Sequence, residues 1–337
     1  MRAAVAHADL PAELHLRHRA GERHILRDAY LPRFRAAGVE AVVGAVFVHP
    51  MFLPEAALSA ALGQIAALEE ELADCPAFAL ATTAAELDAA LDAGRIAVVL
   101  AMEGAEPLRG EAALLPVFFR LGVRILGLTW NGRNAFADGC ALSGGLTPAG
   151  RRLAETAWSL GMALDVSHLS DAGLADLLAL GGGPVLASHS NCRALTGVRR
   201  NLTDGQLALL GSRGAVVGVN QVGFLARRPG TDDGLGDLCA HLLHTAAMAG
   251  PGCPCLGLDM GQYYEAAVPR PRSYRPDPGD ADLLPGYEGL AGLAEALADR
   301  GMPPAQIAAV FHGNLLSFLR RSLPGGSSGC STGGSLV

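Results

Sequence analysis

Short apolar runs recur along the chain and alternate with segments of helical periodicity. Two neighbouring runs, 163–168 and 184–189, each end in a histidine, His168 and His189. Between them, residues 170–180 have a helix-like pattern and are followed by three glycines. A short apolar run, a helix, a glycine break and a second apolar run predict a βαβ unit with parallel strands. We therefore expect both histidines at the carboxyl ends of adjacent strands, where parallel α/β folds bind ligands.

Six further apolar runs extend this pattern over most of the chain. The run at 39–48 is almost continuously apolar, which is typical of a strand buried on both faces. Eight strands with helices between most of them predict a single (β/α)8 barrel. The alternative is an open doubly wound sheet, but no glycine-rich phosphate-binding motif follows the first strand. The expected strands are residues 3–9, 39–48, 96–102, 123–128, 163–168, 184–189, 215–222 and 256–259.

Local capping patterns predict where several helices begin. Thr83 is followed three residues later by Glu86, which is the spacing of a capping box. Thr147 is followed by Pro148, and proline is favoured in the first helical turn. We expect a long loop at 262–284, a barrel domain over residues 1–322 and a Gly/Ser-rich flexible tail over 323–337. The expected helices are 54–72, 83–91, 114–121, a helix from 147, a helix from 203, 235–249, 289–300 and 304–321.

Composition and charge narrow the class of protein and its partners. The 337 residues are 50% hydrophobic, and the formal net charge of −7 argues against binding to nucleic-acid phosphates. No apolar run reaches the ~18 residues of a membrane span, and the apolar run after Arg2 is too short for a signal peptide. The seven cysteines show no disulfide-framework spacing, which fits a reducing compartment. We therefore expect a cytoplasmic protein with neither nucleic acid nor membrane as its partner.

Polar residues with metal-binding chemistry stand at the ends of five expected strands. Buried groups of this kind are costly unless they are paired, hydrogen-bonded or bound to metal. Imidazole and carboxylate together suit zinc, a carboxylate can bridge two ions, and two ions can hold a bridging hydroxide for hydrolysis. The alternative is that each residue makes an unrelated local hydrogen bond. The residues are His7 and Asp9, which share a strand face, Glu103, His168, His189 and Asp259.

Eight stretches of the chain resemble the zinc dipeptidases of the renal (membrane) dipeptidase family. The likeness runs from His7 to about Leu319, which is nearly the whole chain. The resemblance implies a metal-dependent (β/α)8 barrel that hydrolyses dipeptides, including some with a D-residue at the carboxyl side. The stretches are HADL (7–10), EG (103–104), LGVR (121–124), GLTP (145–148), GMALDVSH (161–168), ASHSNCRAL (187–195), RNLTD (200–204) and GN (313–314).

The resemblance also implies a set of metal ligands. His7, Asp9 and Glu103 match the ligands of one zinc ion. Glu103, His168 and His189 match the ligands of a second, so that Glu103 bridges the two ions. The implied cofactor is thus two Zn²⁺ per chain, and the implied activity is dipeptide hydrolysis by a metal-bridging hydroxide. Homodimers are common in this family, so a homodimer is a further expectation.

Two other residues match groups that act on the substrate. Asp259 resembles the family's catalytic acid, which passes a proton from the bridging water to the leaving amine. Arg200 resembles the arginine that clamps the free carboxylate of the substrate, a role that suits the guanidinium fork. The alternative for Arg200 is a surface ion pair.

The chain departs from the family pattern in two places. It has Thr129-Trp130-Asn131 where the family has Thr-His-Asn after the fourth strand, and Asp259-Met260 where the family has Asp-Phe-Asp-Gly. An indole has one N–H and does not become cationic, and losing one oxyanion donor typically costs about 10²–10³ in rate. We expect Trp130 and Asn131 to contact the substrate. The alternatives are an amidohydrolase for a non-peptide amide or lactam, and a metal-retaining barrel that binds without turnover.

Overall fold

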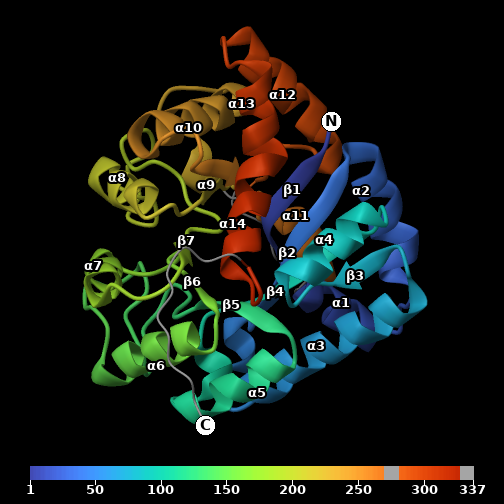
Figure 1. The fold of residues 1–337 in the computed structure, drawn as a ribbon, viewed down its shortest axis with the longest axis vertical. Coiled ribbons are helices and arrows are strands. Elements are labelled where there is room, and N and C mark those ends of the chain that lie inside the picture. Colours follow the sequence, from blue (N-terminus) through green and yellow to red (C-terminus); the bar gives the residue numbers. More distant parts are fainter. Residues whose placement is uncertain (269–280, 327–337) are drawn as a thin grey trace, which may run out of the picture.

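Eight parallel strands form a barrel in the computed structural model, which describes residues 1–268 and 281–326 (Figure 1). Their order is β7-β6-β5-β4-β2-β1-β9-β8, and a parallel bridge between Ala187 and Val217 joins the two ends of this sheet. The predicted (β/α)8 barrel is thus confirmed. The barrel strands are β1 (Ala3–Ala8), β2 (Val39–Phe47), β4 (Ile96–Glu103), β5 (Val123–Gly127), β6 (Ala163–Asp165), β7 (Val185–Leu186), β8 (Val217–Val219) and β9 (Pro254–Leu256).

Helices follow most of the strands and cover the outside of the barrel (Figure 1). The predicted capping box is present, because the Thr83 hydroxyl accepts from the Glu86 N–H and the Glu86 carboxylate accepts from the Thr83 N–H. Thr203 and Gln206 make the same arrangement at a later helix. The helices are α1 (Leu10–Arg19), α2 (Leu31–Ala37), α3 (Ala57–Asp74), α4 (Ala84–Asp92), α5 (Leu115–Arg120), α6 (Pro148–Ser159), α7 (Asp171–Leu180), α8 (Asp204–Ser212), α9 (Gly223–Ala226), α10 (Gly234–Ala249), α11 (Gly261–Ala267), α12 (Leu290–Asp299), α13 (Pro304–Ala308) and α14 (Asn314–Ser322).

Several elements differ from the sequence-based expectation. A short strand, β3 (Phe78–Leu80), pairs with β4 outside the ring and was not predicted. The expected loop at 262–284 begins as α11, so this part of the prediction was wrong; residues 269–280 lie outside the described ranges. The expected helix at 304–321 is divided into α13, a π-helical turn and α14. The tail predicted for 323–337 stays a prediction, since residues from 327 onward are not described.

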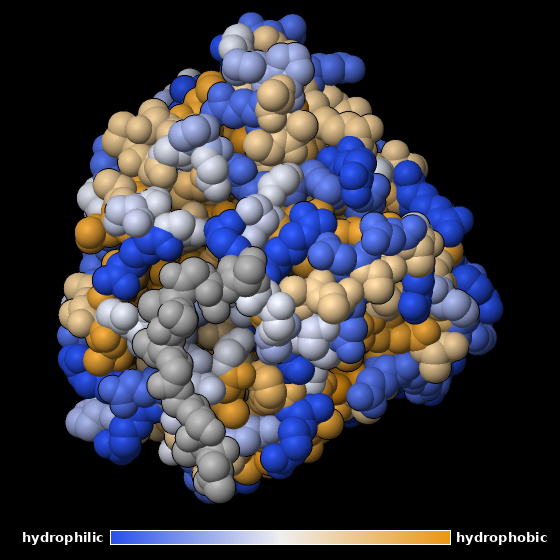
Figure 2. Space-filling view, in the orientation of Figure 1, coloured by the Kyte–Doolittle hydropathy of each residue, from blue (hydrophilic) through white to orange (hydrophobic). Residues whose placement is uncertain are grey.

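The inside of the barrel is filled mainly by small residues and is closed at one end by α14. On β1, Ala4 and Ala6 face the interior cluster, whereas Ala3 and Val5 belong to the cluster between strands and helices. Leu315 and other apolar residues of α14 pack into the interior cluster. Figure 1 shows α14 crossing in front of the strands, and hydrophilic residues lie among apolar ones on the same face in Figure 2. The carboxyl ends of the strands, where the candidate residues lie, are at the opposite end.

A buried histidine joins α10 to the loops that follow β7 and β8. His241 is fully buried, and its Nδ1 accepts a hydrogen bond of 3.1 Å from the Cys192 N–H. Its Nε2 donates to the Ala226 carbonyl at 2.9 Å. Burial lowers the pKa of His241 to about 4, so the ring is neutral near pH 7. His241 therefore makes two backbone connections without carrying a charge.

Two expectations from composition can be compared with the structure. The six cysteines in the described ranges are free thiols, including Cys253 and Cys255 on either side of the β9 start. Among the helices of residues 1–268 and 281–326, none combines the length and the apolar character needed to cross a membrane.

Candidate metal centre

The predicted site residues meet at the carboxyl end of the barrel. They surround a cavity of about 960 Å³. His7 lies beneath this cavity, and its Nε2 is 3.5 Å from Glu103 Oε2 and 3.8 Å from Asp259 Oδ1. Eight predicted residues line the cavity itself: Asp9, Glu103, Trp130, Asn131, His168, His189, Arg200 and Asp259.

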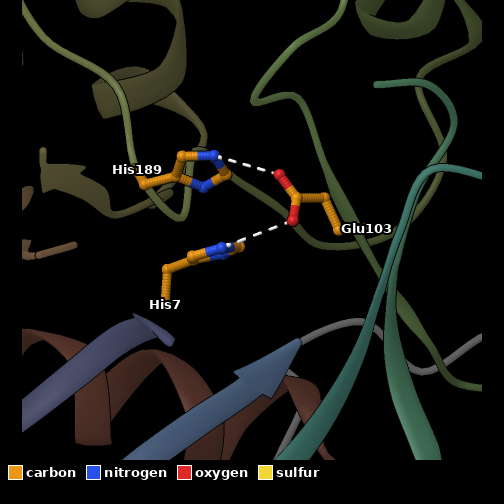
Figure 3. Close-up of side chains that lie close together, drawn as sticks. All are labelled: His7, Glu103 and His189. Carbon is orange, nitrogen blue, oxygen red and sulfur yellow. Dashed lines mark ion pairs between the residues drawn. The ribbon is translucent and has the colours of Figure 1, made fainter. Parts of the chain in front are cut away.

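Glu103, the last residue of β4, has one carboxylate oxygen facing each half of the site. Its Oε2 lies 3.5 Å from His7 Nε2. Its Oε1 lies 2.9 Å from His168 Nε2 and 3.4 Å from His189 Nε2. Figure 3 shows the Glu103 carboxylate beside the rings of His7 and His189, with one oxygen directed at each ring. A carboxylate in this position can contribute one oxygen to each of two ligand groups.

The Nε2 atoms of His168 and His189 point toward each other and toward the Glu103 carboxylate. Their Nε2 atoms are 2.8 Å apart. His168 Nδ1 lies 2.7 Å from Asn131 Oδ1, and His189 Nδ1 lies 2.7 Å from Ser188 Oγ. These partners assign the proton of each ring to Nδ1, which leaves a lone pair on each Nε2. Two lone pairs and a carboxylate oxygen that converge in this way repel one another unless a cation lies between them.

A buried serine supports histidines in both halves of the site. The Ser188 hydroxyl donates to Asp165 Oδ2, which leaves its two lone pairs to accept. His189 Nδ1 lies 2.7 Å from this hydroxyl and His7 Nδ1 lies 3.4 Å from it. Asp165 is held in turn by the backbone N–H groups of Ser167 and Ser188 at 2.9 and 3.0 Å. Sequence reasoning missed both residues; the one available indication was an aspartate inside an apolar run.

Two buried polar atoms in the other half of the site have no hydrogen-bond partner among the described residues. They are His7 Nε2 and Asp9 Oδ1, which lie 3.7 Å apart. Ligand atoms of His7, Asp9 and Asp259 all lie within 4.8 Å of one another, as do those of His7, Glu103 and His189. Imidazole nitrogens and carboxylate oxygens are the donors that zinc and related divalent metals bind. These residues therefore form two overlapping donor groups, both with His7, whose chemistry fits a divalent metal ion.

The electrostatics of the site favour positive charge at His7. Burial alone would lower the pKa of His7, but the carboxylates of Glu103, Asp9 and Asp259 raise it well above its usual value. Burial raises the pKa of Asp9 to about 7. Burial and the neighbouring cations lower the pKa of His189 well below its usual value, so its ring is neutral. The carboxylates thus stabilise a proton on His7. A metal cation at this place would balance the same negative charge.

Asp259 and His168 reach the cavity from strained backbone positions. Their φ angles are +51° and +67°, in the left-handed region that non-glycine residues seldom adopt. Asp259 Oδ2 accepts a hydrogen bond of 2.8 Å from Asn220 Nδ2, and the carboxylate remains 22% exposed. Asp259 is therefore oriented by Asn220, which sequence reasoning missed, and remains accessible from the cavity.

Arg200 is buried at the edge of the cavity after β7. Its Nη1 donates to Ser190 Oγ at 2.7 Å and its Nη2 to the His189 carbonyl at 2.8 Å. Its Nε is buried without a hydrogen-bond partner among the described residues. Burial lowers the pKa of Arg200, because the charged form is desolvated. The surface ion pair considered as an alternative is absent among the described residues, where the Nε N–H is buried and unpaired.

Trp130 and Asn131, which follow β5, have different surroundings. Asn131 Oδ1 is occupied by His168 Nδ1 and by the Cys140 thiol, which donates to it at 3.1 Å. Asn131 therefore orients a histidine as well as lining the cavity. The Trp130 ring lies 6.0 Å from the His168 ring and 5.4 Å from the Phe47 ring, measured between centroids. Trp130 thus contributes an apolar wall beside the candidate ligands.

Comparisons with known proteins identify relatives of this chain in sequence and in structure. A dipeptidase from Schizosaccharomyces pombe described as uncharacterized is 36% identical over 164 residues, which is 47% of this chain and 39% of that protein. Dipeptidase 3 of Macaca fascicularis is 27% identical over 94% of this chain, and the match spans 64% of its length. A metallopeptidase from Rhodobacter sphaeroides, solved with a phosphinate mimic of L-Ala-D-Ala, superposes with a TM-score of 0.82 at 27% identity, covering 96% of this chain and 99% of that one. The family model of the membrane dipeptidases matches residues 3–269, and the chain belongs to this family, peptidase family M19.

Proposed function

We propose that this protein is a metal-dependent dipeptidase whose two zinc ions are bridged by Glu103. The observation that carries the proposal is the position of the Glu103 carboxylate, with His7 Nε2 3.5 Å from one oxygen and His168 Nε2 2.9 Å from the other. His7, Asp9 and Glu103 would hold one ion, and Glu103, His168 and His189 the other. When bound, such a pair of ions supplies an activated water molecule and polarises the scissile carbonyl.

Arg200 binds the free carboxylate of the dipeptide in this proposal. Its buried Nε has no protein partner among the described residues, and a guanidinium pairs well with a carboxylate in a desolvated cavity. The hydrogen bonds to Ser190 and to the His189 carbonyl fix the guanidinium relative to the metal-binding histidines. The substrate is thereby placed at a defined distance from Glu103.

Asp259 moves the proton during hydrolysis. Its carboxylate accepts a proton from the attacking water and donates it to the leaving nitrogen. Asn220 holds Asp259 Oδ2 at 2.8 Å, while Oδ1 faces His7 Nε2 at 3.8 Å. The exposed part of the carboxylate can therefore meet a substrate that enters through the cavity.

The test is hydrolysis of a dipeptide panel by zinc-loaded protein, with matched N-acetyl and C-amide derivatives. The panel includes L-Ala-D-Ala, because the Rhodobacter sphaeroides metallopeptidase was solved with a mimic of it. We expect free dipeptides to be cleaved and C-terminal amides to be poor substrates, since an amide removes the charge that Arg200 binds. Cleavage confined to non-peptide amides would instead indicate an amidohydrolase. No cleavage of either class would indicate a binding protein.

A further inference from the structure

Three aromatic side chains form one wall of the cavity. Phe47 and Tyr264 are each 6% exposed, with ring centroids 5.8 Å apart in an edge-to-face arrangement. The Trp130 ring lies 5.4 Å from Phe47, and all three residues line the cavity. We refer to Phe47, Trp130 and Tyr264 as the aromatic wall. Nothing in the proposed hydrolytic mechanism uses these three rings.

Phe47, the part of the aromatic wall on β2, lies beside Glu103 and on the opposite side of the ring from the strand that Arg200 follows. Phe47 is the register partner of Glu103, so both residues leave their strands at the same level. Phe47 ends β2, whereas Arg200 follows β7, and these strands are four places apart in either direction around the ring. Of the candidate metal ligands, Glu103 stands beside Phe47, and His189 follows the same strand as Arg200. A molecule that spans the cavity from Arg200 to the far side therefore reaches the aromatic wall at Phe47.

This arrangement gives a bound dipeptide one orientation. Together with the proposed function, on which the inference rests, it indicates which amino-terminal residue the site prefers. With the carboxylate at Arg200 and the scissile carbonyl beside Glu103, the amino-terminal residue extends towards the aromatic wall. Aromatic faces and edges bind large apolar side chains and other rings. We propose that the aromatic wall is the subsite for the first residue and selects dipeptides that begin with a large apolar or aromatic residue.

The test compares kcat/KM for Phe-Ala, Leu-Ala and Gly-Ala, with Ala-Phe as the reversed sequence. Differences of one or a few apolar groups change enzyme selectivity by about 10- to 200-fold. We expect the wild-type protein to favour Phe-Ala and Leu-Ala over Gly-Ala by at least about tenfold. Trp130→Ala should remove most of this preference, whereas Trp130→Phe should keep a substantial part of it.

Phe224 provides a matched control because it is an aromatic residue that lines the same cavity from α9, is 49% exposed and lies outside the aromatic wall. Phe224→Ala should leave the ratio of Phe-Ala to Gly-Ala unchanged. Equal cleavage of Gly-Ala and Phe-Ala by the wild type, or a ratio that Trp130→Ala does not change, would overturn the subsite and leave the dipeptidase function intact. Failure to cleave any dipeptide would overturn both. Circular dichroism and metal content of each variant show that folded, loaded proteins are being compared.

Discussion

His168 and His189 direct their Nε2 atoms at each other across 2.8 Å, although each ring places its proton on the opposite nitrogen. This contact is unfavourable by itself, because two lone pairs and the Glu103 carboxylate share one small space. The surrounding hydrogen bonds nevertheless hold both rings in place. The protein therefore supports an arrangement whose repulsion a bound cation removes, which is the electrostatic basis for the predictions about metal content.

Removing the bridging carboxylate should reduce metal binding. If Glu103 joins two ions, Glu103→Ala should lower bound metal from about two ions per chain towards one or none. Elemental analysis of the purified variant measures this directly. Glu106→Gln is the matched control, because Glu106 is a nearby carboxylate outside the ligand groups, hydrogen-bonded to Asn134. Retention of two ions by Glu103→Ala would exclude the bridging role.

Replacing Asp259 should impair turnover and leave metal content unchanged. Asp259→Asn keeps the shape of the side chain but removes its ability to carry a proton, so kcat should fall by about 10² or more. The measurement is kcat per folded, metal-loaded enzyme. Asp282→Asn is the control, because Asp282 lines the same cavity and its hydrogen bond from the Gln262 N–H can be kept by an amide oxygen. If Asp259 were merely structural, the variant would lose stability and keep its turnover.

Ser188 should matter for metal affinity, since its hydroxyl is shared by histidines of both halves of the site. Loss of a residue that orients metal ligands typically weakens metal binding by about 10- to 100-fold. Ser188→Ala should show such a loss in competition with a chelator of known affinity. Ser190→Ala is the comparison, because Ser190 bonds Arg200. It should raise KM with less effect on metal affinity, and an equal loss in both variants would contradict the assignment.

The buried, neutral His241 should make the folded protein less stable in mild acid. Burial lowers its pKa to about 4 in the folded protein, below its ordinary value in an unfolded chain. As pH falls below about 6.5 the unfolded chain takes up a proton first, so the free energy of unfolding decreases until about pH 4. The contribution is about 3 kcal/mol over this range. Denaturant titrations of metal-free wild-type and His241→Gln proteins should differ in pH dependence by about that amount; identical profiles would refute it.

The barrel could be predicted because its strands are short, almost continuously apolar runs, and such runs are typical of parallel strands buried on both faces. The run ending in Glu103 and the run ending in His189 were recognisable from composition alone, and a barrel brings such ends together. The short strand β3 was missed because three residues are too few to show a pattern. Helix α1 was missed because it is rich in arginine and histidine, and α11 because it lies within a segment rich in Pro and Tyr. In both cases contacts with the rest of the protein decide the local structure.

The candidate ligands could be picked out from the sequence, and the residues that orient them could not. Histidine and carboxylate at strand ends are rare enough to suggest chemistry. Ser188, Asn220 and Asp165 belong to residue types that occur throughout any chain, and their roles depend on which atoms the fold brings within hydrogen-bond distance. Asn131 illustrates the difference, since the sequence placed it at the site and the structure shows its oxygen on His168.

We expect bound metal to stabilise the short junction between β7 and β8 against local opening. β7 has two residues, and the ring closes there through Ala187, which exchanges backbone hydrogen bonds with Val216 and Gly218. β2 and β4, by contrast, are in register over seven residue pairs. His189 follows this junction immediately, so an ion bound between His189 and Glu103 would link it to the long strands on the far side of the ring. Amide protons along the junction should therefore exchange fastest when the metal is removed, and slow down as it binds.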